Sequence, residues 1–123
     1  MAEKILVVDD EPDTLSLLGM TLARAGYTVL KAATAKACLD LAHKEQPDLI
    51  ILDVMLPDGS GVDVLKTLRA EQATPPVIFF TAKGRAEDMS DGIQAGAYKY
   101  LVKPTSREKL LETIKAALAE VKK

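Results

Sequence analysis

Residues suited to metal and phosphate chemistry follow four apolar runs of this 123-residue sequence. Asp9 and Asp10 come directly after "KILVV", and Asp53 comes after "DLIIL". Thr81 follows "PVIFF", and Lys103 follows "YKYLV". Carboxylates bind hard cations and can attack phosphorus, whereas a hydroxyl and an ammonium bind phosphoryl oxygens. These residues could form one site if the fold brings the ends of the four runs together.

The apolar runs alternate with segments whose apolar residues recur at helical spacing. In the runs at 4–9 and 48–53 the apolar residues are continuous rather than alternating, which is typical of parallel strands buried on both faces. Strands are therefore expected at 4–9, 27–33, 48–53, 76–82 and 98–102. Helices are expected from Pro12 to before Gly26, over 35–45, after a turn at 57–61, over 85–95 and from about Ser106. Five βα units in strict alternation predict an α/β domain with a parallel sheet and helices on both faces.

The same spacing predicts which residues cap the helices and which face the core. Thr34 is expected to cap the second helix, and Met89 and Ile93 are expected to point inward from the fourth. The last helix is expected to bury Leu111, Ile114, Leu118 and Val121. In such a sheet ligands bind at the carboxyl ends of the strands, so residues that end strands should form the site.

Composition limits the function classes. Sixteen basic and eighteen acidic residues give a formal charge of −2, which does not indicate direct nucleic-acid binding. The single cysteine, Cys38, cannot form an internal disulfide, and "MAEKILVV" lacks the features of a signal peptide. No apolar run reaches the roughly 18 residues of a membrane span. A cytoplasmic protein without membrane association is expected.

Clustered strand-end acids would need a cation. At an effective dielectric constant of about 20, two carboxylates ~4 Å apart repel by roughly 4 kcal/mol. Their oxygen ligands fit Mg²⁺, with Mn²⁺ as a substitute, because Mg²⁺ binds through one or two carboxylates and retains waters. A metal alone would not require Thr81 and Lys103, which suit a phosphoryl group arriving beside it. An aspartate can attack that group to form an aspartyl phosphate.

Four stretches in order, "KILVVDDEP", "LIILDVMLPDGSG", "FFTAKG" and "AGAYKYLVKP", resemble the receiver domain of response regulators in two-component signalling, of the chemotaxis-regulator type. The resemblance covers the whole sequence and implies one receiver domain over 1–123. It implies a flavodoxin-like fold with sheet order 2-1-3-4-5. It also implies a phosphoacceptor signalling domain that catalyses only its own phosphorylation and dephosphorylation.

The resemblance assigns a role to each acid of the site. Asp53 would be the phosphoacceptor. Asp10 would bind Mg²⁺ directly together with Asp53 and the backbone carbonyl of Met55, and Asp9 would hold a metal-bound water. Glu11 is expected to be a loop acid near the pocket without a ligand role.

Further roles follow from the resemblance for residues beyond the acids. Thr81 would bond a phosphoryl oxygen, and Lys103 would pair with its charge. Tyr100 would change rotamer on activation together with Thr81, altering the surface of the fourth helix, fifth strand and fifth helix. The Lys103–Pro104 peptide is expected to be cis.

Two positions are expected to tune the lifetime of the phosphoryl group. Met55 and Lys83, each two residues beyond Asp53 and Thr81, resemble positions whose side chains cover the acyl phosphate. Thr105 stands where the family often has Phe.

The resemblance also implies partners. The phosphoryl donor would be a sensor histidine kinase or a histidine phosphotransfer protein, and the reader would be an unknown downstream protein or an effector domain. No effector domain is recognisable in this chain, so it would act alone or be part of a longer regulator. The state could be monomeric or a phosphorylation-dependent dimer.

Other classes fit less well. A haloacid-dehalogenase-type hydrolase would need a second acid where Met55 stands. A nucleotide- or flavin-binding module would need a glycine-rich phosphate loop after a strand, and none follows. A degenerate receiver used only for protein binding would usually lack one of the acids, the Thr or the Lys.

The remaining polar residues are expected to have structural roles. Asp58 is interpreted as a turn residue, Asp48 as a strand-entry residue and Asp63 as a first-turn helix residue. His43 is expected to be solvated near the end of its helix. Tyr98 is expected on the same strand face as Tyr100.

Overall fold

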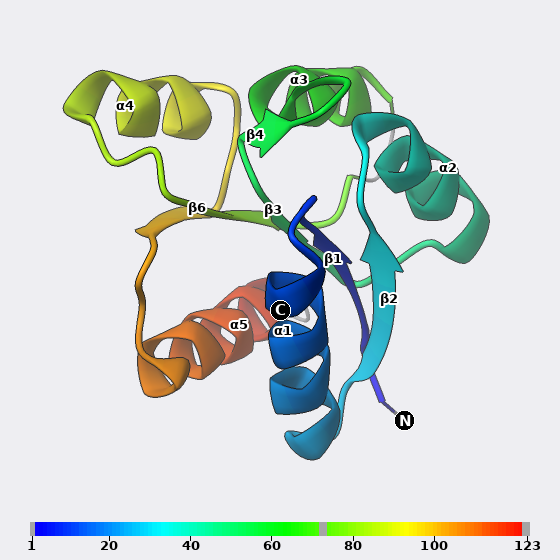
Figure 1. Cartoon of the computed structure of the whole chain (residues 1–123). Helices are drawn as coiled ribbons and strands as arrows, with labels where there is room; N and C mark the ends of the chain where they lie inside the picture. The colour runs from blue at the N-terminus through cyan, green and yellow to red at the C-terminus, as the bar shows by residue number, and fades with distance from the viewer. Residues whose placement is uncertain (1, 72–73, 122–123) are drawn as a thin grey trace.

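A parallel sheet forms the middle of the structure (Figure 1). The structure is a computed structural model that describes residues 2–71 and 74–121. Within those residues the main sheet has five strands in the order β2-β1-β3-β6-β7, and every neighbouring pair is parallel. The strands are β1 (Lys4–Val8), β2 (Thr28–Ala32), β3 (Leu49–Leu52), β6 (Val77–Thr81) and β7 (Lys99–Val102). Numbered within this sheet alone, the order is 2-1-3-4-5, so the predicted flavodoxin-like topology is confirmed.

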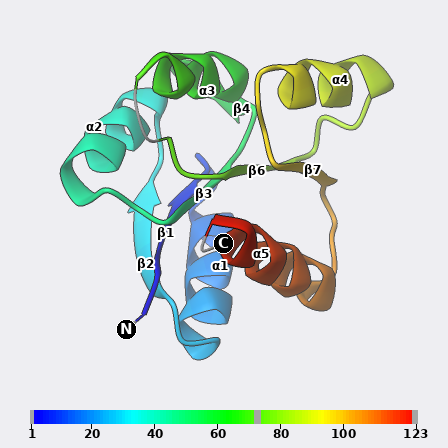
Figure 2. The same ribbon diagram turned by 180° about the vertical axis from the view of Figure 1, so that it is seen from behind.

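Helices cover both faces of this sheet. They are α1 (Pro12–Arg24), α2 (Ala35–Glu45), α3 (Gly61–Ala70), α4 (Ala86–Gln94) and α5 (Arg107–Val121). Figures 1 and 2 show α2, α3 and α4 on one face and α1 and α5 on the other. None of the described helices is both long and apolar enough to cross a membrane.

The core is divided between the two faces of the sheet. On β1, Leu6 and Val8 belong to the cluster beneath α2 and α3, whereas Ile5 and Val7 belong to the cluster beneath α1 and α5. Successive strand residues point to opposite faces, and both faces here are covered. This explains why the strand is uniformly apolar up to Asp9.

The predicted helix boundaries agree with the local structure. Thr34 caps α2, because its side chain accepts a hydrogen bond of 3.0 Å from the N–H of Ala37. Pro12 occupies the first turn of α1, where its missing N–H needs no partner. Gly26 follows α1 with φ of 98°, a conformation that glycine adopts readily.

The predicted inward face of α4 is wrong. Met89 and Ile93 are 37% and 47% exposed. The buried residue of α4 is Gly92, whose backbone lies directly against the Tyr100 ring. The helix approaches the sheet too closely at this point for a large side chain, and its apolar residues therefore face outward.

The last helix is also placed slightly differently from the expectation. Ile114 and Leu118 are buried as predicted, but Leu110 is buried more deeply than Leu111, which packs at the edge of the same cluster. The side chain of Val121 lies outside the described residues.

The predicted turn after β3 forms part of a short β-hairpin. Strand β4 (Met55–Leu56) pairs antiparallel with β5 (Gly59–Ser60), so the segment folds back on itself immediately after Asp53. The side chain of Ser60 then caps α3 by accepting a hydrogen bond of 3.1 Å from the N–H of Val62. The hairpin places Met55 at the rim of the site.

Candidate functional site

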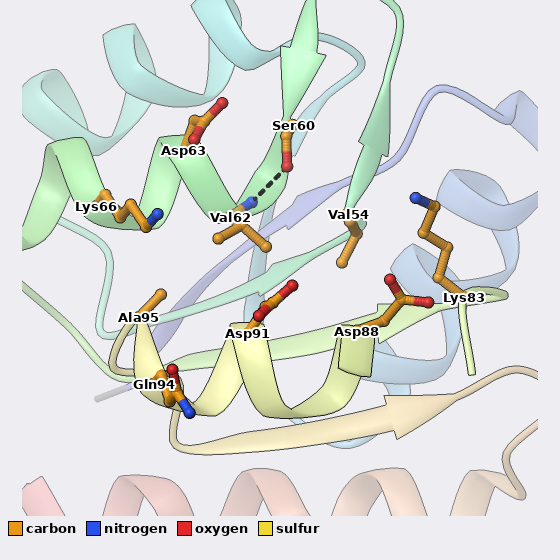
Figure 3. A pocket seen from close by; sticks show the side chains of 10 residues that line it. All are labelled: Val54, Ser60, Val62, Asp63, Lys66, Lys83, Asp88, Asp91, Gln94 and Ala95. Carbon is orange, nitrogen blue, oxygen red and sulfur yellow. Dashed lines mark hydrogen bonds between the residues drawn. The ribbon is translucent and has the colours of Figure 1, made fainter. Parts of the chain in front are cut away.

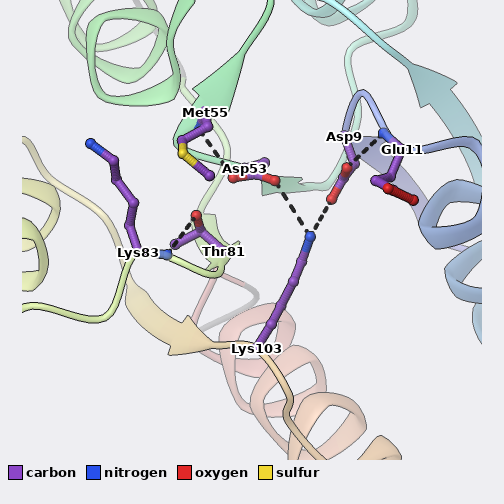
Figure 4. Close-up of polar contacts among 7 residues, drawn as sticks. All are labelled: Asp9, Glu11, Asp53, Met55, Thr81, Lys83 and Lys103. Atoms are coloured by element: carbon purple, nitrogen blue, oxygen red, sulfur yellow. Dashed lines mark hydrogen bonds and ion pairs between the residues drawn. The ribbon is translucent and has the colours of Figure 1, made fainter.

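The strand-end residues singled out in the sequence meet at one edge of the sheet. Asp9 and Asp53 follow the neighbouring strands β1 and β3, while Thr81 ends β6 and Lys103 follows β7. Figure 4 shows their side chains converging on a common space between the strand ends and the Met55 hairpin. An open depression of about 420 Å³ lies here, lined by both acids and Lys103.

Three carboxylates form a compact cluster. Asp9, Asp10 and Asp53 each offer an oxygen atom, and these atoms lie within 4.8 Å of one another. Asp9 and Asp53 are only 2% and 5% exposed, whereas Asp10 is exposed. Hard oxygen donors that are partly open to water are the donors that Mg²⁺ prefers. The donor set therefore fits this ion.

Lys103 bridges the two buried acids. Its Nζ lies 2.6 Å from Asp9 Oδ2 and 3.4 Å from Asp53 Oδ2. Burial of the ammonium acts to lower its pKa, but the hydrogen bond and charge of Asp9 and the charge of Asp53 outweigh burial, so the pKa of Lys103 is raised. The lysine therefore stays charged and offsets part of the repulsion between the carboxylates.

Backbone donors hold the other oxygens of the same two acids. The N–H of Glu11 donates to Asp9 Oδ1 at 2.9 Å, and the N–H of Met55 donates to Asp53 Oδ1 at 3.0 Å. Each buried carboxylate is thus fixed between one main-chain donor and the Lys103 ammonium. Glu11 takes part through its backbone.

Thr81 and Tyr100 are joined through the main chain of Lys83. Thr81 is fully buried, and its Oγ1 accepts a hydrogen bond of 3.3 Å from the Lys83 N–H. The Tyr100 hydroxyl donates to the Lys83 carbonyl at 2.7 Å, and its ring is 6% exposed. Burial and the charges of Asp88 and Asp53 raise the pKa of Tyr100, so this hydroxyl keeps its proton. This connection was not evident from the sequence.

The segment after β7 contains a cis peptide between Lys103 and Pro104. Thr105, at the position where Phe is often found, donates its hydroxyl proton to the Val102 carbonyl at 2.7 Å. Tyr98 precedes β7 and is 38% exposed, in contrast to the buried Tyr100.

Two further residues shape the site in ways that the sequence did not reveal. The N–H groups of Ala35 and Lys36 donate to the Asp58 carboxylate at 2.7 and 3.1 Å, so Asp58 joins the hairpin to the start of α2. Gly61 lies so close to the end of β3 that an added Cβ would be 2.2 Å from the Asp53 carbonyl oxygen. The motif "PDGSG" predicts a turn but neither of these contacts. The contact of Asp58 is with residues far away in the sequence, and that of Gly61 depends on how the backbone packs.

Asp48 and His43 contact distant segments. Asp48 accepts a hydrogen bond of 2.7 Å from the Lys4 N–H at the entry to the sheet. His43 is exposed, as expected, and its Nε2 also lies 2.6 Å from Glu71 Oε2. None of these residues lines the acidic depression.

Comparison with known proteins supports the same interpretation. The profile of the response regulator receiver domain family matches residues 5–115. The alkaline phosphatase synthesis transcriptional regulatory protein PhoP of Bacillus subtilis is 42% identical over 118 residues, covering 96% of this chain and 49% of the relative. The chain spans about half the length of the curated relatives it matches.

Solved structures agree over nearly the whole chain. The chemotaxis response regulator CheY4 of Vibrio cholerae is 33% identical with a TM-score of 0.87, covering 95% of this chain and 99% of that one. A CheY-like receiver domain protein from Methanospirillum hungatei is 32% identical with a TM-score of 0.93, covering 98% and 96%. The chain therefore belongs to the response-regulator receiver domain family of two-component signalling, in which phosphorylation of an aspartate and Mg²⁺ binding at an acidic pocket are characteristic.

Proposed function

We propose that Asp53 accepts a phosphoryl group from the phosphohistidine of a sensor histidine kinase or a histidine phosphotransfer protein. The observation that carries this proposal is the position of the Asp53 carboxylate, held by the Met55 N–H at 3.0 Å and lying 3.4 Å from Lys103 Nζ. An Asp53 oxygen attacks phosphorus and forms a P–O bond while the P–N bond breaks. The bonding pair of electrons leaves on the imidazole nitrogen, which regains a proton from solvent.

Mg²⁺, or Mn²⁺ in its place, would be held by the side chains of Asp10 and Asp53 and by the Met55 carbonyl. Asp9 would hold a water of that ion. The compact carboxylate cluster supports this assignment. When bound, the metal supplies positive charge that favours approach of phosphoryl oxygens to the acids.

Lys103 and Thr81 would bind the transferred group. The Lys103 ammonium is already inside the pocket, within reach of Asp53, so it can pair with phosphoryl oxygens after a small displacement. Thr81 lies nearby, and its hydroxyl, which accepts a hydrogen bond from the Lys83 N–H, keeps its own proton to donate to a phosphoryl oxygen. Both groups would hold negative charge that is absent before transfer.

The transferred charge would shift a conformational equilibrium. Phosphorylation adds about −1.5 to −2 charges, and a hydrogen bond to a charged group is worth roughly 1.5–3 kcal/mol. If Thr81 meets the phosphoryl group in one conformation only, about 3 kcal/mol changes the population ratio ~100-fold. Because Lys83 joins Thr81 to Tyr100, the surface formed by α4, β7 and α5 would respond.

The wider assignment rests on the same family membership. Residues 1–123 would form one receiver domain that catalyses only its own phosphorylation and dephosphorylation in the cytoplasm. A downstream protein or an effector domain would recognise the α4–β7–α5 surface, with no direct contact to nucleic acid or membrane. Phosphorylation would favour either this partner or dimerisation of the chain.

Incubation with Mg²⁺ and acetyl phosphate, followed by intact mass measurement, tests the proposal. We expect a mass gain of one phosphoryl group in the parent chain and in Asp63→Asn, an exposed acid on α3, but not in Asp53→Asn. A gain that persists in Asp53→Asn would place the chemistry elsewhere. No gain with acetyl phosphate or with a histidine kinase would favour a receiver that only binds proteins, and repeated turnover of a phosphate monoester would favour a hydrolase.

A further inference from the structure

Helix α4 rests on the sheet through a glycine. Among the residues of α4, all of which the structure describes, Gly92 alone is buried. A Cβ added at Gly92 would lie 2.8 Å from Tyr100 Cδ2, 3.0 Å from Tyr100 Cε2 and 3.1 Å from Phe79 Cδ2. The Tyr100 ring therefore occupies the space that any other residue at position 92 would need.

The rings beneath Gly92 have little freedom to move away. Phe79 is fully buried in β6, and its ring centroid lies 5.6 Å from that of Tyr100. The Tyr100 hydroxyl is tied to the Lys83 carbonyl at 2.7 Å. An added methyl group at position 92 must therefore displace the Tyr100 ring or the helix itself.

The other side of α4 offers room for such a displacement. A hollow of about 540 Å³ separates α4 from α3 (Figure 3), with Asp88 and Asp91 on the α4 side and Asp63 and Lys66 on the α3 side. Charged side chains facing an open hollow do not fix a helix as a packed apolar face does. The position of α4 therefore depends strongly on its contact with Tyr100 through Gly92.

The Tyr100 contact is also connected to the phosphoacceptor pocket. The Lys83 carbonyl accepts a hydrogen bond from the Tyr100 hydroxyl, and the Lys83 N–H donates one to the Thr81 hydroxyl. Thr81 ends β6, which pairs with β3, the strand that precedes Asp53. An outward movement of the whole Tyr100 side chain breaks the first of these bonds. The same glycine contact therefore affects both the outer surface and the pocket.

We propose that Gly92 is a positioning residue for Tyr100: the missing side chain permits the buried position of the ring, and any larger residue shifts the ring outward. This inference deepens the proposed function, on which its signalling consequence rests. In Gly92→Ala, Tyr100 would lose its bond to Lys83, and the state of the α4–β7–α5 surface would no longer follow phosphorylation of Asp53.

Fluorine NMR of the full chain labelled with 3-fluorotyrosine provides a direct test. The sequence contains three tyrosines, Tyr27, Tyr98 and Tyr100, so each resonance can be assigned with a Tyr→Phe variant. We expect Gly92→Ala to move the Tyr100 resonance towards its position in the unfolded chain and to increase its response to replacing H₂O by D₂O. The Tyr27 resonance should not move.

Gly19→Ala in α1 is the matched control, because its added Cβ would meet the end of the flexible Lys31 side chain, 2.7 Å from Cε. Replacing glycine by alanine within a helix is otherwise stabilising. We therefore expect Gly19→Ala to raise the melting temperature and Gly92→Ala to lower it. In a Tyr100→Val background, which removes the ring, Gly92→Ala should lower the melting temperature much less than in the parent, because only the 3.1 Å contact with Phe79 Cδ2 remains.

An unchanged Tyr100 resonance in Gly92→Ala would overturn the inference, as would equal melting-temperature gains from Gly92→Ala and Gly19→Ala. Phosphorylation by Mg²⁺ and acetyl phosphate is measured separately by mass in the same samples. If Asp53 is labelled but Tyr100 does not move, only the role of Gly92 is wrong. If the Tyr100 resonance moves but neither the parent chain nor Gly92→Ala is phosphorylated, the proposed function is wrong and the steric role of Gly92 remains.

Discussion

At the scale of single residues, the site combines a partly buried cation with two buried anions. Lys103 contacts Asp9 at 2.6 Å and Asp53 at 3.4 Å, and its side chain is 23% exposed. Removing one partner of such an arrangement leaves uncompensated charge, which typically costs more than the pair itself contributes. Lys103 therefore stabilises the pocket before any phosphoryl group arrives.

Lys103→Met should lower the free energy of unfolding by about 3 kcal/mol at neutral pH without added metal. Added Mg²⁺ should stabilise this variant more than the parent, because the ammonium no longer competes with the ion for the acids. Urea unfolding with and without Mg²⁺ measures both effects, with Lys99→Met, exposed on β7, as the control. An equal or smaller Mg²⁺ effect in Lys103→Met would contradict this explanation.

The stabilising contribution of Lys103 should depend on pH in one direction. The folded pKa of Lys103 is raised, so its stabilising contribution is complete below the unfolded pKa of about 10.4 and is lost as the pH rises through the folded value. The stability difference between the parent and Lys103→Met should therefore narrow only in alkaline solution. A difference that disappears between pH 7 and pH 9 would show that the ion pair is not its source.

Side chains at the rim of the pocket should control how long the phosphoryl group persists. Met55 is 48% exposed beside the acids, and Lys83 extends from the loop after Thr81. We expect Met55→Ala and Lys83→Ala to change the dephosphorylation rate by about tenfold, or about 1.4 kcal/mol in the barrier, with little change in Mg²⁺ affinity. Rates equal to that of the parent in both variants would refute a covering role for these side chains.

At the scale of elements, the hairpin after β3 is fastened to the start of α2. Asp58 accepts two backbone hydrogen bonds there, from Ala35 and Lys36. These bonds lower the pKa of Asp58, so its contribution is present above the unfolded pKa of about 3.9 and is lost as the pH falls through the folded value. The hairpin also carries Met55, whose N–H holds Asp53.

Asp58→Asn should lower the melting temperature at pH 7, and the difference from the parent should shrink as the solution is acidified below about pH 4. Thermal unfolding across this pH range checks the prediction, with Glu112→Gln, exposed on α5, as the control. A constant difference at all pH values would mean that the Asp58 charge is not responsible.

The elements also show how far the sequence could predict the structure. Strand-end acids, Thr34 as a cap and the sheet order followed from local pattern and from the resemblance. The inward face of α4 did not, because the apolar residues Met89 and Ile93 are exposed and the close contact uses Gly92. Some contacts have no sequence signature, such as the hydrogen bond between Asp58 and the start of α2. They depend on which segments the tertiary fold brings together.

At the scale of the whole molecule, the two-sided core fixes the strands whose ends form the site. Cys38 is fully buried between α2 and the sheet, and burial raises the pKa of its thiol from 9.0 to about 12. A buried thiol with a raised pKa stays protonated near neutral pH, so its reactivity should depend on opening of the domain.

Cys38, the single cysteine of the sequence, should therefore resist iodoacetamide in the native protein and react once the chain is unfolded. Its labelling should follow the urea transition measured by circular dichroism. A Cys38→Ala variant carrying Ala116→Cys, at an exposed position of α5, should react without urea. Rapid labelling of native Cys38 would contradict a closed core beneath α2.

The most direct measurement of the central claim is reductive trapping of the acyl phosphate at residue resolution. After incubation with Mg²⁺ and acetyl phosphate, borohydride reduces an aspartyl phosphate to homoserine, which peptide mass spectrometry can locate. We predict homoserine at Asp53 alone, and none when Mg²⁺ is chelated. Homoserine at Asp9 or Asp10, or none at Asp53 in folded protein with intact donor, would contradict Asp53 as the phosphoacceptor.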